Sequence, residues 1–173
     1  MQPRFLIYGA TGFLGGAIAR LAVQRDLRPI IAGRDATRIE ALAAELDVDC
    51  RVFNLSDPTT MDAALKEVSA VLHCAGPYIF TWKEMVDACL RTRTHYMDIT
   101  GEIPVYEAMS ARDAEAKTQG VMVLPGVGFD VVPTDCLALH LKQRLPSATH
   151  LTLAFHIDGP AGMPPGTAKT IIE

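Results

Sequence analysis

The chain has 173 residues, a formal net charge of −4 at pH 7 and a calculated pI near 5.7. Hydrophobic residues make up 49% and charged residues 21% of the chain, which excludes a disordered protein and allows a buried core. The mild acidity argues against a nucleic-acid-binding surface, which needs a clustered basic face. No segment reaches the roughly 20 apolar residues that are needed to span a membrane.

Short apolar segments alternate with longer amphipathic segments along the chain. We expect strands at residues 4–8, 29–32, 50–53, 70–74, 94–98 and 121–124. We expect helices at residues 12–25, 36–46, 59–67, 81–91, 103–119 and 134–144. Strand–helix alternation that repeats six times predicts a parallel sheet with helices on both faces. Because crossover connections are right-handed, the predicted fold class is α/β with a doubly wound parallel sheet.

The end of the sequence has a different character. Residues 150–157 are expected to form a further strand, and a loop rich in glycine and proline follows. Residues 167–173 have the pattern of a helix that has just begun. We therefore expect one domain at residues 1–147 and the start of a second, truncated domain at residues 148–173.

The first predicted strand runs directly into a G-x-x-G-x-x-G turn that opens a helix. Gly9 permits the tight turn, Gly12 lets the backbone approach a pyrophosphate, and Gly15 lets the helix pack closely on the sheet. The start of the helix then offers unpaired N–H groups and a partial positive charge to the phosphates. This context predicts a Rossmann dinucleotide-binding fold. The residues of the turn that we expect beside the cofactor are Gly9, Thr11, Gly12, Phe13, Leu14 and Gly15.

The end of the second strand distinguishes NADP from NAD. A carboxylate there would bind the ribose 2′-hydroxyl of NAD, whereas an arginine would pair with the 2′-phosphate of NADP. Arg34 stands directly at the strand end, and Asp35 is placed to cap the following helix. Arg38, one helical turn further on, is placed to add a second positive charge. The predicted cofactor is therefore NADP, with NAD as the less favoured choice.

Ligands of such sheets lie outside the carboxyl ends of the strands. Asn54 and Leu55 end the third strand, where Asn54 suits an adenine contact and equally the shaping of a turn. The fourth strand leads into a loop that suits a nicotinamide ribose, formed by Cys74, Ala75, Gly76 and Pro77. The candidate acid–base groups on this rim are Tyr78, Asp98, Glu102 and Asp130. For the three carboxylates, helix capping or loop shaping is the competing interpretation.

Three further segments make the glycine turn more specific: C-A-G-P-Y at 74–78, D-x-T-G-E at 98–102 and G-F-D-x-x-P-T-D at 128–135. With the turn and Arg34, they resemble the saccharopine dehydrogenase-like NAD(P)-binding domain, in the branch of saccharopine dehydrogenase-like oxidoreductases and trans-acting enoyl reductases. The resemblance implies that Tyr78 lies beside the nicotinamide. It also implies that Asp98, Thr100 and Glu102 face the substrate cleft, and that a C-terminal substrate domain is missing here.

The expected function is hydride transfer between NADP(H) and a small imine, enoyl or carbonyl-type substrate. One alternative is a non-enzymatic redox sensor that binds NADP. Another is a short-chain dehydrogenase-like reductase, although its Tyr-x-x-x-Lys pair is absent because Lys83 comes five residues after Tyr78. The chain alone is expected to bind cofactor but to turn over weakly or not at all.

The remaining expectations concern the surroundings of the protein. The four cysteines form no C-x-x-C pair, which favours reduced thiols and a cytoplasmic location. The histidines lack metal-ligand spacing, so no metal is expected. An exposed sheet edge would favour pairing into a homodimer.

Overall fold

The computed structural model of the chain describes residues 4–129, 131–154 and 156. Six parallel strands form one sheet in the order β3-β2-β1-β4-β5-β6. This order confirms the predicted doubly wound sheet, because consecutive strands run outward from β1 in one direction and from β4 in the other. The strands are β1 (Phe5–Tyr8), β2 (Ile30–Gly33), β3 (Cys50–Val52), β4 (Ala70–His73), β5 (His95–Asp98) and β6 (Val123–Leu124).

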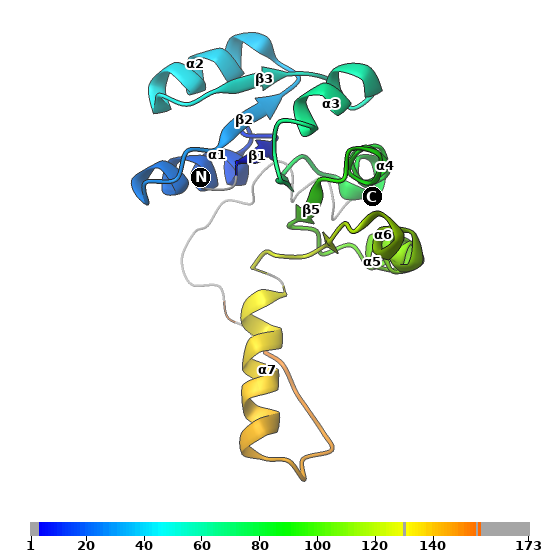
Figure 1. The fold of residues 1–173 in the computed structure, drawn as a ribbon. Coiled ribbons are helices and arrows are strands. Elements are labelled where there is room, and N and C mark those ends of the chain that lie inside the picture. The colour runs from blue at the N-terminus through cyan, green and yellow to red at the C-terminus, as the bar shows by residue number, and fades with distance from the viewer. Residues whose placement is uncertain (1–3, 130, 155, 157–173) are drawn as a thin grey trace.

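Helices cover both faces of the sheet (Figure 1). One face packs against α1 and α2, and the other packs against α3, α4, α5 and α6. A 3-10 turn, η1, precedes α4 and was not predicted. The helices are α1 (Phe13–Gln24), α2 (Ala36–Leu46), α3 (Pro58–Leu65), η1 (Tyr78–Phe80), α4 (Trp82–Thr92), α5 (Ile103–Ser110), α6 (Asp113–Gln119) and α7 (Val132–Arg144).

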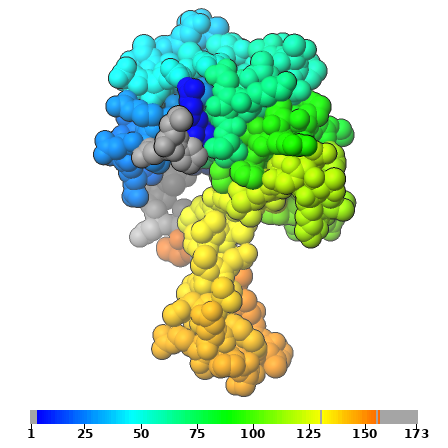
Figure 2. Space-filling view, viewed as in Figure 1, coloured from blue at the N-terminus to red at the C-terminus, as the bar shows by residue number. Residues whose placement is uncertain are grey.

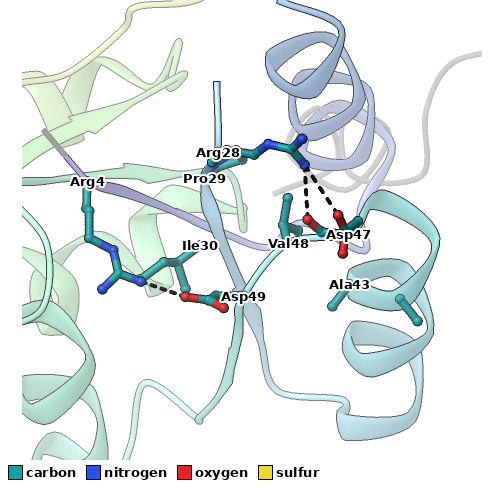
Figure 3. A pocket seen from close by; sticks show the side chains of 9 residues that line it. Arg4, Arg28, Pro29, Ile30, Ala43, Asp47, Val48 and Asp49 are labelled. Carbon is teal, nitrogen blue, oxygen red and sulfur yellow. Dashed lines mark hydrogen bonds and ion pairs between the residues drawn. The ribbon is translucent and has the colours of Figure 1, made fainter. Parts of the chain in front are cut away.

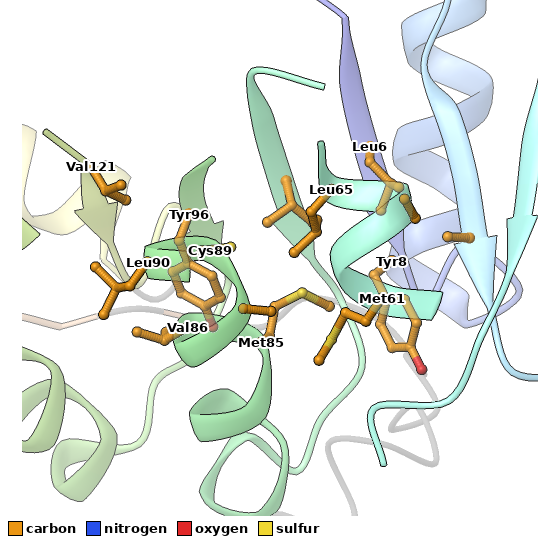
Figure 4. Packing of buried hydrophobic residues seen from close by; sticks show 14 of the residues in the cluster. Leu6, Tyr8, Met61, Leu65, Met85, Val86, Cys89, Leu90, Tyr96 and Val121 are labelled. Atoms are coloured by element: carbon orange, nitrogen blue, oxygen red, sulfur yellow. The ribbon is translucent and has the colours of Figure 1, made fainter. Parts of the chain in front are cut away.

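The central strand β1 supplies both layers of the core. Because side chains alternate along a strand, Leu6 and Tyr8 pack on the side of α3 and α4, while Ile7 packs on the side of α1 and α2. Figure 4 shows Met61 and Met85, from α3 and α4, between the rings of Tyr8 and Tyr96 in the larger cluster. All of these side chains are at most 4% exposed, so the sheet is buried on both faces.

Two sequence expectations about the elements were wrong. The helix expected at 103–119 is broken into α5 and α6, because Arg112 leaves the helical conformation, with φ −98° and ψ 9°. Its guanidinium pairs with Asp87 on α4 and with Glu115, which fixes the break. Residues 150–154 and 156 form no strand, since these exposed residues have no neighbouring strand to pair with. The helix expected at 167–173 lies outside the described residues.

The last helix, α7, stands away from the sheet (Figures 1 and 2). None of its residues is buried, and Leu137 and Leu139 are 55% and 61% exposed. Leucines two positions apart point to opposite sides of a helix, so α7 is apolar on more than one side. Within the described residues, each helix is too short or too polar to cross a membrane.

Candidate functional site

The register of the sheet brings the carboxyl ends of four strands, β2, β1, β4 and β5, side by side. Tyr8 at the end of β1 is aligned with Ala32 in β2 and with His73 in β4, and His73 is aligned with Asp98 in β5. The chain leaves β1 and β4 in opposite directions, so the topological switch point lies between them. This edge is where an open α/β sheet binds its ligand.

The glycine turn closes tightly over this edge. Gly9 has φ +82°, and its N–H donates to Ala32 O at 2.8 Å. A Cβ on Gly15 would lie only 2.3 Å from Gly9 O, so only glycine lets α1 start this close to the turn. Gly12 is the N-cap residue of α1, and no side chain caps the helix. The first N–H groups of α1 therefore remain available to an anion.

The end of β2 places two arginines beside this turn. Asp35 caps α2 by accepting from Arg38 N at 3.1 Å, which confirms its predicted capping role. The Arg38 guanidinium donates to Thr11 O at 3.0 Å and so ties α2 to the glycine turn. Arg34 is exposed, and its charge lowers the pKa of Tyr8, which burial raises more strongly. The positive charge of Arg34 therefore lies near Tyr8, at the end of β1.

The third strand end is shaped as a turn. Asn54 Oδ1 accepts from Ser56 N at 3.2 Å, and Asn54 O accepts from Asp57 N at 3.0 Å. Leu55 is half-buried against the core. Turn shaping by Asn54 is thus shown, and its contact with adenine stays a proposal.

The loop after β4 lies directly against the glycine turn. A Cβ on Gly9 would come within 2.9 Å of Cys74 C and 3.0 Å of Ala75 Cβ. The Gly76–Pro77 peptide bond is cis. Burial raises the pKa of the Cys74 thiol to about 12, so this cysteine is not a reactive thiolate. The structure therefore brings together the residues that were predicted around the phosphates and the nicotinamide.

The buried side chain of His73, which was not among the predicted site residues, holds this loop through Thr81. It is fully buried, and its Nε2 lies 3.0 Å from Thr81 Oγ1. Since Thr81 Oγ1 donates to Ala75 O at 2.8 Å, it accepts from His73 Nε2, which leaves Nδ1 buried without a partner among the described residues. Burial lowers the pKa of His73 to about 3.

This depressed pKa predicts acid sensitivity of the fold. The unfolded chain takes up the His73 proton near pH 6.5 and the folded chain only near 3, so the free energy of unfolding should fall as pH drops through that window. The maximum slope is about 1.4 kcal/mol per pH unit. His73→Gln retains a donor to Thr81 but does not titrate, so it should reduce the slope of the free energy of unfolding against pH. Urea unfolding at several pH values measures the slope; exposed His140→Gln is the control, and parallel wild-type and His73→Gln curves would refute the assignment.

Tyr78 points inward. Its ring is 8% exposed and meets the His73 ring edge-on at 5.5 Å, and its hydroxyl donates to His73 O at 3.3 Å. Burial raises the pKa of Tyr78 strongly. The hydroxyl therefore has a backbone partner inside the protein.

Asp98 is the centre of a buried hydrogen-bond network. Its Oδ2 accepts from the Tyr96 hydroxyl at 2.6 Å, and its Oδ1 accepts from Thr100 N at 3.0 Å and from Gly126 N at 2.9 Å. Burial raises the pKa of Asp98, although these hydrogen bonds oppose the shift. Asp98 thus joins the end of β5 to the loop after β6. Tyr106 completes the junction by donating to Thr100 O at 2.7 Å.

Glu102 also has internal partners. Its Oε1 accepts from Tyr78 N at 2.8 Å, and its Oε2 accepts from Ile79 N at 2.7 Å. It is the N-cap residue of α5, but its side chain does not cap that helix. Asp130, the fourth predicted acid–base group, lies outside the described residues. The three described candidates therefore cluster at one edge, and each is engaged in holding the fold together.

Two cavities lie away from this edge. One of about 640 Å³ is at the opposite edge of the sheet, before β1, β2 and β3 (Figure 3). Its arginines are paired, with Arg4 Nη2 at 2.6 Å from Asp49 Oδ2 and Arg28 Nη1 at 3.9 Å from Asp47 Oδ2. Another, of about 560 Å³, lies between α5, α6 and β6. Neither of these two cavities is lined by residues of the glycine turn.

The sequence is similar to those of known proteins. The family pattern described as the saccharopine dehydrogenase NADP binding domain matches residues 5–124. The trans-acting enoyl reductase of Mycobacterium leprae is 32% identical over 148 residues, covering 81% of this chain and 35% of that protein. The human saccharopine dehydrogenase-like oxidoreductase is 26% identical over 192 residues, covering 96% of this chain and 44% of that protein. The chain thus spans less than half the length of these relatives.

Solved structures show the same fold. The apo saccharopine dehydrogenase (L-Glu forming) of Saccharomyces cerevisiae aligns with a TM-score of 0.69 at 19% identity, covering 83% of this chain and 31% of that one. The triphenylmethane reductase of Citrobacter, complexed with NADP(H), aligns with a TM-score of 0.53 at 20% identity, covering 67% and 46%. The family pattern covers well over half of the chain and confirms both the predicted resemblance and the predicted cofactor. The chain belongs to the saccharopine dehydrogenase NADP-binding domain family.

Proposed function

We propose that this domain binds NADP(H) across the carboxyl edge of the sheet. The observation that carries the proposal is the start of α1, which no side chain caps. It lies in the Gly9–Gly15 turn, at the switch point of the sheet. The pyrophosphate lies at this helix start, the 2′-phosphate at Arg34, and the adenine near Asn54 and Leu55. The nicotinamide lies beside the loop formed by Cys74, Ala75, Gly76 and Pro77.

Arg34→Ala tests the 2′-phosphate site. Losing one charge-assisted pair should weaken NADPH binding by about 10- to 100-fold. NADH binding should not change, because NADH carries no 2′-phosphate. Calorimetric titration with each cofactor measures both affinities. Arg25→Ala, at the far end of α1, is the charge-matched control. The assignment would be contradicted if the wild-type chain bound NADPH and NADH equally well. It would also be contradicted if Arg34→Ala bound NADPH as tightly as wild type.

For the complete protein we propose an oxidoreductase that transfers a hydride between NADP(H) and an imine, enoyl or carbonyl-type substrate. The printed names of the relatives, an enoyl reductase and a saccharopine dehydrogenase-like oxidoreductase, support this reaction class. We place the dinucleotide-binding domain at 1–147 and the start of a substrate domain at 148–173. The role of this chain's residues is to bind the cofactor and to orient its nicotinamide end.

A second candidate function is a redox sensor that binds NADP without turnover. The internal hydrogen bonds of Tyr78, Asp98 and Glu102 favour it, because they occupy the described acid–base candidates. Oxidation of NADPH by the full-length protein in the presence of enoyl, imine and carbonyl acceptors separates the two functions. Turnover of any acceptor supports the enzyme; tight NADPH binding without turnover supports the sensor.

We also propose a cytoplasmic location and a homodimer. A reducing compartment fits the free thiols of Cys50, Cys74, Cys89 and Cys136.

Pairing of two copies into a homodimer would cover the edge strand β6. Sedimentation of the purified chain tests the second point.

A further inference from the structure

We propose that Glu102 is a positioning residue for the cofactor: its carboxylate clamps the backbone at Tyr78 and Ile79 and thereby fixes the nicotinamide wall, which we define as residues 74–79. The inference rests on the proposed function, because it assumes that the nicotinamide end of NADP(H) lies against this wall. It assigns to Glu102 a task different from the acid–base role that its position on the rim predicts.

The clamp consists of two short hydrogen bonds from adjacent peptide groups. The two carboxylate oxygens accept separately from Tyr78 N at 2.8 Å and from Ile79 N at 2.7 Å. Glu102 is itself held in place, because its own N–H donates to Thr100 Oγ1 at 3.1 Å. Hydrogen bonds to an ionised carboxylate are about twice as strong as those between neutral groups. The clamp therefore ties the wall after β4 to the strand end of β5.

A second contact holds the wall from the side of the core. Thr81 Oγ1 lies 2.8 Å from Ala75 O and 3.2 Å from Pro77 O, and it accepts from the buried His73. Thr81 therefore binds the carbonyl oxygens of Ala75 and Pro77 within the wall. Glu102 binds the N–H groups of Tyr78 and Ile79 at its end. Neither of these contacts lies on the side of the wall that faces the glycine turn.

The wall and the glycine turn are in direct contact, which makes the clamp relevant to binding. A Cβ on Gly9 would lie only 2.9 Å from the backbone of Cys74 and 3.0 Å from the methyl group of Ala75. A shift of the wall by a fraction of an ångström therefore changes the space beside the turn. Productive hydride transfer requires the reacting atoms to be held within about 3–3.5 Å, so a small shift matters.

The chemistry of the clamp excludes proton donation by Glu102 in this conformation. Both oxygens face N–H donors, and an ionised carboxylate is an acceptor at both. A protonated carboxyl group would set its O–H against an N–H. Glutamine at this position has one acceptor oxygen and would set its NH₂ group against the second N–H. Glu102→Gln therefore loosens the wall without changing the size of the side chain.

The test compares two ligands. NADPH reaches the wall, whereas 2′-phospho-ADP-ribose has the adenosine and phosphate parts but no nicotinamide. In Glu102→Gln, we expect the affinity for NADPH to fall by about tenfold, as for one lost charge-assisted hydrogen bond, and the affinity for 2′-phospho-ADP-ribose to stay unchanged. Trp82 is the single tryptophan of the chain and begins α4, two residues after the end of η1. Energy transfer from Trp82 to the bound dihydronicotinamide should also decrease.

Two further variants complete the design. Glu107→Gln removes the same charge from an exposed position of α5 and should behave as wild type. Thr81→Val loosens the wall from its other side and should weaken NADPH selectively, which keeps the inference testable if Glu102→Gln does not fold. Equal weakening of both ligands, or wild-type affinity and energy transfer in Glu102→Gln, would overturn the clamp while leaving the proposed function intact. A wild-type chain that binds neither ligand would overturn both.

Discussion

Gly15→Ala is expected to lower the free energy of unfolding by about 3 kcal/mol and to abolish cofactor binding with it. The added Cβ would lie 2.3 Å from Gly9 O, 2.9 Å from Gly9 C and 3.1 Å from Ala10 Cα. These are backbone atoms of a turn that is fixed on its other side, because Gly9 N and Ala10 N both donate to Ala32 O. The clash can be relieved only by moving α1 off the sheet. Urea unfolding and calorimetric titration with NADPH measure the two losses.

Gly12→Ala is the matched control within the same turn. Its Cβ would lie 3.1 Å from Gly9 O, a contact that a shift of a few tenths of an ångström relieves. Stability should therefore stay within about 1 kcal/mol of wild type, whereas NADPH affinity should fall at least tenfold because the methyl group faces the proposed pyrophosphate site. A Gly15→Ala variant as stable as wild type would disprove the packing role. Tight NADPH binding by Gly12→Ala would argue against the phosphate site.

Asp98→Ala is expected to cost about 3–5 kcal/mol of stability. The substitution leaves the Tyr96 hydroxyl and the N–H groups of Thr100 and Gly126 buried without their acceptor. Each unsatisfied buried group costs about 1–3 kcal/mol. Asp98→Asn keeps an oxygen for the two N–H groups and should cost only about 1 kcal/mol. Denaturant unfolding of the three proteins at one pH measures the difference.

The pH dependence separates the two variants further. Burial raises the pKa of Asp98 above its ordinary value of 3.8, so the folded chain keeps this proton to a higher pH than the unfolded chain. Within that window the folded state binds more protons, and the free energy of unfolding therefore falls as pH rises. Asp98→Asn should lack this fall. If Asp98→Ala is as stable as Asp98→Asn, the network around Asp98 does not stabilise the fold as argued.

Local patterns were sufficient to predict the sheet and the cofactor edge. The local signals are the short apolar run of the first strand, the spacing of Gly9, Gly12 and Gly15, and the Arg34–Asp35 pair. Each acts over a few residues, so its consequences can be predicted from neighbouring positions. Asp35 illustrates this, since its capping partner is only three residues away. The family pattern then confirmed the fold and NADP together.

The roles of the acidic residues depended on contacts that no local pattern contains. Glu102 was placed on the rim from its position after β5, but its partners are 23 and 24 residues earlier in the chain. The Gly126 partner of Asp98 is 28 residues later. The break before α6 likewise depends on Arg112 reaching Asp87, on another helix. Such pairings follow from the strand order and from loop shape, which the sequence does not display.

The strand order also sets a sequence of events during synthesis. The neighbours of β1 are β2, which follows closely, and β4, whose residues Ala70–His73 pair with Phe5–Tyr8 across 65 positions. On the ribosome, one side of β1 therefore has no hydrogen-bonding partner until β4 has emerged, while β2 and β3 can already pair. Nascent chains that stop before residue 70 expose this unpaired strand to other chains. The ligand-binding edge is thus completed only after the chain has been made as far as His73.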